Sequence, residues 1–324
     1  MDELLSALKA AAEPTRLRLL ALCARADLTV TELVKLLGQS QPRLSRHLKL
    51  LADAGLLDRL QEGAFAYWRL AQRGPGAPIA RQLIEALPSD DPVLIADGNR
   101  LDELRRTRSD RAETYFRDVA ASWDGIRSLH VDEAEVEQAL LKLVPQRKVH
   151  DLLDLGTGTG RMLQLLAPRA EQATGVDRSR EMLAIARARL DEAGLRHCVV
   201  RQADMARLPF DDASFDLIVC HMALHYAEAP PEIVAEAARV LRPGGTLLLI
   251  DFAPHDRDVL QREHAHRWLG FEPASLARWC RDAGLHPLPP ATLAGGELTV
   301  TVLRADRRAE LNFSDDAREL RVGH

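Results

Sequence analysis

The sequence has few cysteines, no long apolar run and no net positive charge, and each of these absences excludes a class of protein. Its four cysteines, Cys23, Cys198, Cys220 and Cys280, lack the spacing of a metal site, so we expect reduced thiols in a cytoplasmic protein. No apolar run approaches the roughly 20 residues that span a bilayer, and the acidic start of the chain has no signal-peptide pattern. The net charge of -5 excludes a generic polyanion binder, so any nucleic-acid contact must come from a local basic patch.

A chain of 324 residues exceeds what one core usually organises, so two domains are expected. The pattern at the start of the chain predicts helices over 2–12, 16–24, 30–37 and 41–54, strands over 57–60 and 64–70, and a helix over 79–87. Gly38 suits a helix end, and Ser40 with Pro42 suits the start of the next helix. A helix–turn–helix followed by a hairpin indicates a winged helix of the α+β class, to which we assign 1–87.

The expected helix over 41–54 has an apolar side and a basic side. Leu44, Leu48 and Leu51 share the side that we expect in the core. The opposite side carries three cations and no acid, which suits insertion into the major groove of DNA. The candidate DNA-binding residues are Gln41, Arg43, Ser45, Arg46, Lys49, Arg59 and Tyr67. The alternative is a solvated helix face on an interaction domain.

Three stretches of this domain resemble the ArsR family of winged-helix repressors. They are 13–20 (Glu-Pro-Thr-Arg-Leu-Arg-Leu-Leu), 40–49 (Ser-Gln-Pro-Arg-Leu-Ser-Arg-His-Leu-Lys) and 51–56 (Leu-Ala-Asp-Ala-Gly-Leu). The resemblance implies a double-stranded DNA operator as partner and a homodimer formed through 2–12 and 79–87. Metal-sensing members carry a Cys-x-Cys pair where this chain has Thr29 and Thr31, and hydroxyls are poor ligands for soft metals. We therefore expect no metal site and a different inducer.

From residue 149 the pattern changes to strands that alternate with helices, which predicts a Rossmann-like, doubly wound α/β sheet. The expected strands are 152–155, 173–176, 198–202, 215–220, 246–252 and 298–303. The expected helices are 133–143, 160–168, 179–193, 231–240 and 273–283. We assign 146–305 to this second domain, 88–145 to a helical linker or cap, and 306–324 to a charged tail.

The expected strand over 152–155 runs into a turn with glycines at alternate positions, Gly156, Gly158 and Gly160. Glycine suits a tight turn that a ligand approaches closely. Nicotinamide, flavin and S-adenosylmethionine (SAM) enzymes all use such turns, but this spacing departs from the G-x-G-x-x-G of dinucleotide folds. Asp177, roughly 20 residues further on, stands where a ribose-binding acid is expected, and Asp204 follows the next strand. The alternative role for an acid after a strand is a helix cap.

The run from 149 to 252 resembles class I SAM-dependent methyltransferases, especially the branch that contains ubiquinone-biosynthesis methyltransferases. Beyond the turn, the matching stretches are 208–219 and 240–247. The resemblance implies SAM, or its product S-adenosylhomocysteine (SAH), as cofactor, with Asp154 at its methionine end, Asp177 at its ribose and Asp204 at its adenine. The candidate cofactor-binding residues are Asp154, Gly156, Thr157, Gly158, Gly160, Asp177, Arg178, Ala203, Asp204, Met205 and His221.

Histidines after the fourth strand of this domain are the candidate acid–base groups. Positioning does much of the work of methyl transfer, and a base is needed only where the acceptor must lose a proton. His225 is the candidate catalytic base, and a packing or capping role is the alternative. His255, His264 and His266 are expected at the surface.

Several other residues are expected to be structural or to line the pocket. Cys198 and Cys220 have the pattern of buried strand residues, which argues against a thiolate site for arsenite. Tyr115, Phe116 and Trp123 lie in or next to a charged, helical stretch over 99–122. They are expected either to line the cofactor pocket or to pack in the core.

Two functions fit these patterns. In the first, the second domain transfers methyl groups from SAM to a small-molecule acceptor, and the first domain regulates transcription. In the second, the methyltransferase domain is catalytically silent, and its binding of SAM or SAH controls repression. A DNA methyltransferase is disfavoured, because Cys220-His221-Met222-Ala223 stands where base-modifying enzymes have an Asn/Asp-Pro-Pro-aromatic motif.

Overall fold

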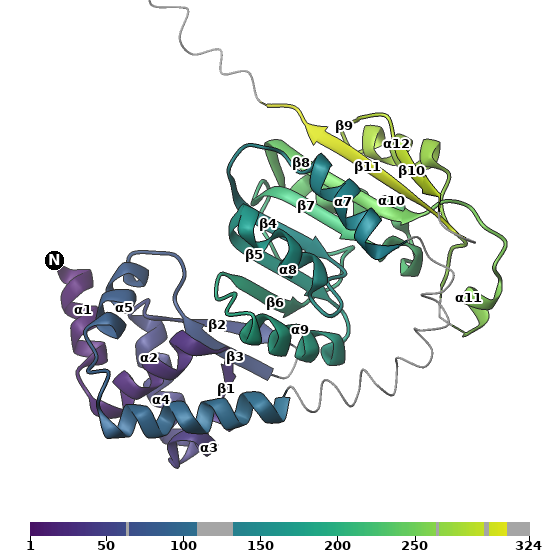
Figure 1. Ribbon diagram of the computed structural model, residues 1–324. Helices are drawn as coiled ribbons and strands as arrows, with labels where there is room; N and C mark the ends of the chain where they lie inside the picture. Colours follow the sequence, from purple (N-terminus) through teal and green to yellow (C-terminus); the bar gives the residue numbers. More distant parts are fainter. Residues whose placement is uncertain (63–64, 109–131, 264–265, 295–297, 310–324) are drawn as a thin grey trace, which may run out of the picture. The chain divides into compact units, whose positions relative to one another are not determined.

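The computed structural model describes residues 1–62, 65–108, 132–263, 266–294 and 298–309 (Figure 1). These residues fall into two compact units. The first unit gathers the described residues of Met1–Asp118, Gly158–Gln164 and Asp177–Ala203. The second unit gathers those of Val119–Thr157, Leu165–Val176 and Asp204–His324. Within the described ranges, every helix is too short or too polar to cross a bilayer.

The first unit contains a winged helix at the start of the chain (Figure 1). Its helices are α1 (Asp2–Ala11), α2 (Pro14–Arg25), α3 (Val30–Leu37), α4 (Gln41–Asp53) and α5 (Gly76–Glu85). Its strands are β1 (Leu28–Thr29), β2 (Leu57–Glu62) and β3 (Phe65–Leu70), which form an antiparallel sheet in the order β1-β3-β2. The predicted helix–turn–helix and hairpin are confirmed. The two-residue strand β1 was not predicted, because it is too short to show a periodic pattern.

Local hydrogen bonds define both ends of α3. The Oγ1 of Thr29 accepts from the backbone N–H of Glu32 at 3.3 Å, and the Glu32 carboxylate accepts from the backbone N–H of Thr29 at 2.8 Å. Such a capping box satisfies two donors that a helix start leaves without partners. Gly38 ends α3 with a φ of +65°, in the left-handed region that favours glycine. Thr29 therefore has a structural role at a position where the resemblance places a metal-binding cysteine in other proteins.

The core of the winged helix has the composition that the sequence predicted. Leu44, Leu48 and Leu51 on α4 are fully buried and pack with apolar residues of α2, α3 and β3. Residues 92–108 are also helical, and Asp97 in that helix accepts two hydrogen bonds from Arg18 of α2, at 2.6 and 2.8 Å. Tyr115, Phe116 and Trp123 lie outside the described residues.

The larger sheet is α/β and mainly parallel, as predicted. Its strands are β4 (Val149–Leu155), β5 (Ala170–Asp177), β6 (Cys198–Gln202), β7 (Phe215–His221), β8 (Leu241–Phe252), β9 (Leu285–Pro287), β10 (Ala291–Ala294) and β11 (Thr299–Arg307). The order is β10-β11-β8-β7-β4-β5-β6, and β9 pairs with β11. β4 lies parallel to both β5 and β7, whereas β11 runs antiparallel to β8. The strand order reverses beside β4, and ligands of open α/β sheets bind at such switch points.

Five helices lie at the places that the alternating pattern indicated. They are α7 (Glu133–Leu143), α8 (Arg161–Leu166), α9 (Arg180–Glu192), α10 (Pro230–Val240) and α12 (Pro273–Asp282). The short elements η1 (Ala167–Arg169), η2 (Leu224–Tyr226) and α11 (Val259–Glu263) were not predicted as separate elements. The predicted helix over 160–168 is shorter in the structure, because Pro168 lies in the 3₁₀ turn η1 that follows α8. The predicted helix over 79–87 begins earlier, at Gly76, where Pro75 already has helical backbone angles.

Candidate functional site

The exposed side of α4 is cationic. Gln41, Arg43, Ser45, Arg46 and Lys49 are all exposed, so the structure places five of the candidate DNA-binding residues on one helix. The Arg43 guanidinium lies 3.7 Å from the Glu13 carboxylate. Arg43 is exposed and Glu13 half-buried, and an ion pair at that distance near the surface contributes little to stability.

The other two candidate DNA-binding residues belong to the wing. The Arg59 guanidinium of β2 lies 6.0 Å from the ring centre of Trp68. Tyr67 of β3 is half-buried, and the guanidinium of Arg187 from α9 lies 4.0 Å from its ring centre. Tyr67 is therefore engaged in a cation–π contact inside the first unit.

The second unit holds the beginning of the glycine turn. Asp154, near the end of β4, is buried and accepts a hydrogen bond from the Thr157 hydroxyl at 2.6 Å. Gly156 has a φ of +69°. A Cβ added to Gly156 would overlap Ala223 and lie 3.3 Å from the Met205 sulfur. The end of β4, Met205 and Ala223 therefore meet at a point where only a glycine fits.

The first unit holds the rest of the turn. The Gly158 N–H donates to the Asp177 carboxylate at 2.9 Å, and the Ser179 N–H donates to its other oxygen at 2.8 Å. Ser179 in turn caps α9 by accepting from the Met182 N–H at 3.2 Å. Gly160 has a φ of +82°, and an added Cβ would lie 3.2 Å from Ala186. Asp177 thus links the turn to the start of α9.

The residues after β6 are arranged less tightly. The Ala203 N–H donates to the Asp177 carbonyl at 3.0 Å, and the Gln202 side chain donates to the Arg178 carbonyl at 2.9 Å. Asp204 is exposed, and its carboxylate accepts from the Ala206 N–H at 3.0 Å. The Asp204 carboxylate therefore forms a local turn and has its outer surface open to solvent.

A buried histidine–carboxylate pair lies beyond β7 in the second unit. The Nδ1 of His225 is 2.7 Å from the Asp251 carboxylate, and both side chains are 2 % exposed. Met222 precedes η2 with a φ of +52°, a strained conformation for a residue with a side chain. Burial lowers the pKa of His221, at the end of β7, to about 4, so this ring is neutral at pH 7.

Aromatic rings surround His225. The ring centres of Tyr226 and His266 lie 4.2 and 4.1 Å from that of His225, and the ring centre of Phe252 lies 5.2 Å away. The prediction that His266 lies at the surface is wrong, because His266 is buried against these rings. Its surrounding loop looked polar in the sequence, and only the tertiary structure shows the ring folded inward. His264 lies outside the described residues.

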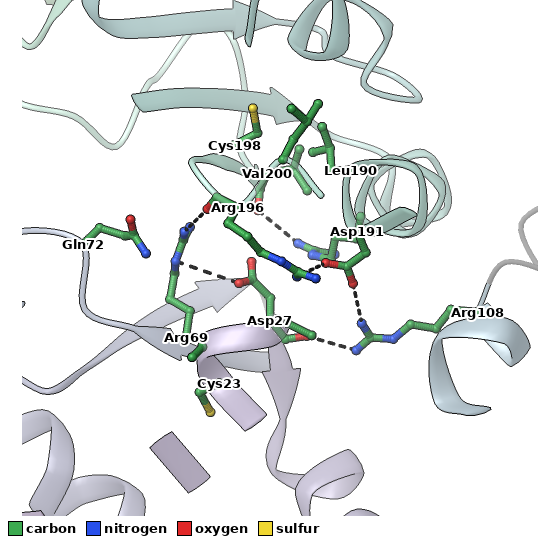
Figure 2. Close-up of a pocket in the computed structure, with 14 residues that line it drawn as sticks. Cys23, Asp27, Arg69, Gln72, Arg108, Leu190, Asp191, Arg196, Cys198 and Val200 are labelled. Atoms are coloured by element: carbon green, nitrogen blue, oxygen red, sulfur yellow. Dashed lines mark hydrogen bonds and ion pairs between the residues drawn. The ribbon is translucent and has the colours of Figure 1, made fainter. Parts of the chain in front are cut away.

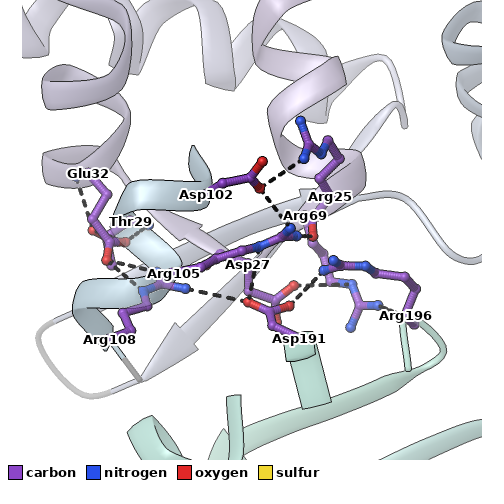
Figure 3. A network of polar contacts seen from close by, with 10 residues as sticks. All are labelled: Arg25, Asp27, Thr29, Glu32, Arg69, Asp102, Arg105, Arg108, Asp191 and Arg196. Atoms are coloured by element: carbon purple, nitrogen blue, oxygen red, sulfur yellow. Dashed lines mark hydrogen bonds and ion pairs between the residues drawn. The ribbon is translucent and has the colours of Figure 1, made fainter. Parts of the chain in front are cut away.

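A network of charged side chains runs through the first unit from α9 to α3 (Figure 3). Asp191, near the end of α9, lies 2.6 Å from Arg196 and 3.8 Å from Arg108. Arg108 lies 2.7 Å from Glu32, the residue that completes the capping box of α3. Burial raises the pKa of Asp191 despite the neighbouring guanidinium groups, which lower it.

The same network reaches the wing through Arg69 of β3 (Figure 2). Arg69 donates to the Arg196 carbonyl at 3.1 Å and lies 3.9 Å from Asp27. These side chains line a hollow that also includes Cys23 and Cys198. Burial raises the pKa of the Cys198 thiol to about 12 and that of Cys23 further, so both thiols stay protonated at neutral pH.

The sequence analysis missed this charged network. Its members are spread from Arg25 to Arg196, and no spacing in the sequence marks them as neighbours. The expectation that Cys198 and Cys220 are buried strand residues is confirmed.

Two stretches of the chain match known families. Residues 13–59 match the model of bacterial regulatory proteins of the arsR family, and residues 153–249 match that of a methyltransferase domain. The chain carries an ArsR-family helix–turn–helix domain and a methyltransferase domain. The two family resemblances drawn from the sequence are therefore confirmed.

Known methyltransferases are similar to part of this chain. The uncharacterised methyltransferase YcgJ of Bacillus subtilis (strain 168) is 35 % identical over 125 residues, which are 38 % of this chain and 49 % of YcgJ. A ubiquinone biosynthesis O-methyltransferase of Azoarcus sp. (strain BH72) is 27 % identical over 182 residues, covering 52 % of this chain and 78 % of that protein. The chain spans about half of the length of YcgJ.

One solved structure with a bound cofactor is also similar. It is the geranyl diphosphate C-methyltransferase from Streptomyces coelicolor A3(2), in complex with Mg2+, geranyl diphosphate and SAH. Its sequence is 18 % identical, its TM-score is 0.48, and the match covers 54 % of this chain and 79 % of that chain.

Two glycine substitutions test the close packing at the turn of the methyltransferase domain. Gly156 and Gly194 have φ values of +69° and +67°, but an added Cβ at Gly194 has no atom within 4 Å. We expect Gly194→Ala to lower the free energy of unfolding by about 1–2 kcal/mol through left-handed strain alone. Gly156→Ala should lower the free energy of unfolding clearly more than Gly194→Ala does, because the Cβ at Gly156 also overlaps Ala223. Equal losses in urea denaturation would contradict the close approach of Ala223.

Proposed function

We propose that the protein is a SAM-dependent methyltransferase for a small-molecule acceptor, joined to a DNA-binding regulator domain. The observation that carries this proposal is the Asp177 carboxylate, which the N–H groups of Gly158 and Ser179 hold at the end of β5. A carboxylate beside a glycine turn suits the two hydroxyls of a ribose, because each of its oxygens can accept more than one hydrogen bond.

The described residues fit such a cofactor. At Gly156 the chain passes against Ala223 and Met205 with no room for a side chain, which is the close backbone approach that a glycine turn provides. We assign the methionine end to Asp154, Gly156 and Thr157, and the ribose to Gly158, Gly160 and Asp177. The remaining contacts, at the adenine and the reacting end, are assigned to Arg178, Ala203, Asp204, Met205 and His221. SAM, when bound, supplies an electrophilic methyl group.

The first domain is proposed to bind a DNA operator through α4. Arg43, Arg46 and Lys49 supply the positive charge, and Gln41 and Ser45 supply hydrogen bonds. Arg59 extends this surface onto the wing. Tyr67 is proposed to support the wing through its cation–π contact with Arg187.

A homodimer is proposed to present two such helices to two half-sites of the operator. Leu4, Leu5 and Leu8 of α1 are 42 %, 45 % and 43 % exposed, an apolar stripe that suits contact with a second copy. α1 and α5 lie against each other, so both can contribute to one interface.

A pair of substitutions tests the two binding functions independently. Asp177→Ala should raise the Kd for SAH about 10-fold or more in isothermal titration, because two or more charge-assisted hydrogen bonds are lost. Its affinity for duplexes selected from a random DNA pool by the wild-type protein should stay unchanged. Arg46→Ala should do the reverse and weaken DNA binding about 5- to 100-fold. Unchanged SAH affinity in Asp177→Ala would show that the cofactor site is misplaced.

The proposed dimer is tested with two leucines of similar exposure. Leu5→Glu on α1 should shift the protein to a monomer in analytical ultracentrifugation and weaken operator binding, because a charge is buried at the interface. Leu288→Glu, at a residue that is 44 % exposed near β9, should leave the dimer intact. A dimer that survives Leu5→Glu would place the interface elsewhere.

A second candidate function, control of DNA binding by SAM or SAH, is favoured by the charged network of the first unit. α9 starts beside the Asp177 carboxylate and carries Asp191 in its last turn, 3.8 Å from Arg108. Arg108 lies 2.7 Å from the Glu32 carboxylate of the α3 capping box. A cofactor that shifts α9 would therefore change the contacts that hold the helix–turn–helix. Such control requires a difference in cofactor affinity between the DNA-bound and free states.

Neighbouring acids on α9 test this coupling. In the wild type we expect saturating SAH to change the operator Kd about 5-fold or more, a typical allosteric coupling. Asp191→Asn should bring the ratio of the operator Kd without SAH to that with SAH toward one, because the contact with Arg108 is weakened. The affinity for SAH itself should stay unchanged. Glu192→Gln, at the adjacent exposed position, serves as the matched control and should keep the ratio. If the operator Kd of the wild-type protein is the same with and without saturating SAH, the sensor function is ruled out.

A further inference from the structure

We propose that Asp251 is a positioning residue that makes His225 the proton acceptor for a neutral hydroxyl, so that the acceptor of the methyl group is an alcohol or a phenol. This inference rests on the proposed methyltransferase function. It adds to it a second residue and a class of acceptor.

Three backbone N–H groups and the ring of His225 contact the Asp251 carboxylate. One oxygen accepts from the backbone N–H groups of Leu224 and His225, at 3.0 and 3.2 Å. The other accepts from the Phe252 N–H at 2.8 Å and lies 2.7 Å from the His225 Nδ1. Because both oxygens already act as acceptors, the proton between the pair resides on Nδ1. The lone pair of the imidazole is then on Nε2, which is the atom able to take a proton.

The backbone around His225 holds the ring in place as well. The His225 carbonyl accepts from the N–H groups of Arg267 and Trp268, at 2.9 and 3.2 Å. The Trp268 indole donates to the Ala227 carbonyl at 2.8 Å. The ring itself packs against the rings of Tyr226 and His266. A ring held on all these sides keeps one orientation, which a positioned base requires.

His225 also lies on the acceptor side of the candidate site. It is two residues after Ala223, the residue that an added Cβ at Gly156 would overlap. Both residues follow β7, which is parallel to and paired with β4. The proposed methionine end of the cofactor and the proposed base are therefore neighbours along one short loop of the second unit.

The charge balance of the transfer separates acceptors that need a base from those that do not. A lone pair of the acceptor oxygen forms the new C–O bond, and the electron pair of the breaking C–S bond returns to sulfur. The hydroxyl proton passes to His225 Nε2 and later to solvent. A carboxylate is already anionic, and a neutral amine attacks through its own lone pair, so neither needs a base during attack. A hydroxyl, in contrast, must lose its proton, and the histidine–carboxylate pair provides the base that accepts it.

The tautomer of His225 provides a test that does not depend on activity. In ¹⁵N spectra of histidine-labelled full-length protein, with His225→Gln used for assignment, we expect a protonated Nδ1 and an unprotonated Nε2. Asp251→Asn should raise the Nε2-protonated fraction, because an amide can donate to Nδ1. A wild-type ring that carries its proton on Nε2 overturns the proposal, even if the Asp251→Asn protein fails to fold.

Transfer from labelled SAM provides the second test, with phenol and 4-nitrophenol, aliphatic alcohols, benzoate and benzylamine as acceptors. Asp251→Asn and His225→Gln should lower kcat for phenol about 10²–10⁴-fold, with SAM affinity unchanged. For 4-nitrophenol, which ionises without a base at pH 8, the loss should be within a few fold. Equal losses for both phenols, or transfer to benzoate or benzylamine alone, overturn the proposal. A protein that fails to bind SAM, or that transfers to no compound, contradicts the proposed function instead, and the tautomer still decides the role of Asp251.

Discussion

The left-handed backbone of the glycine turn is the constraint on which the rest of the candidate site depends. Gly156, Gly158 and Gly160 all have positive φ, so the chain can leave β4, turn sharply and enter α8. The turn brings the Gly158 N–H to Asp177 and leaves Gly156 against Ala223. A side chain at Gly156 would overlap Ala223. The proposed roles of Asp177 and of the loop after β7 both rest on these contacts.

Helix α9 connects two parts of the first unit, the Asp177 carboxylate and the cluster of arginines. Its N-terminal end is capped by Ser179, whose N–H donates to Asp177, and its C-terminal end carries Asp191. One rigid helix thus joins a proposed ligand carboxylate to a cluster of arginines. Arg108 continues the connection to Glu32, so the capping box of α3 contacts the same cluster. The proposed catalysis and the proposed sensing are therefore compatible uses of one site.

Much of the fold was predictable because its signals are local. The apolar spacing on α4 predicted the buried leucines, and the alternation after residue 149 predicted the parallel strands. The strands β1, β9 and β10 were missed, since segments of two to four residues carry no period. His266 was misplaced for a related reason. A polar loop in the sequence gives no sign that one of its rings packs inward against His225.

The sequence by itself determined the two families, the helix–turn–helix, the glycine turn and the presence of Asp177 and His225 near the ends of strands. Those features depend on residue type and on spacings within one or two elements. The tertiary structure alone decided that Asp251 holds His225 and that Arg108 joins Asp191 to Glu32. Such pairs join residues that are 26 to 83 positions apart, and any of the chain's many acids and bases could have formed them. Only folding selects the partners, because it brings together the particular side chains whose burial must be compensated.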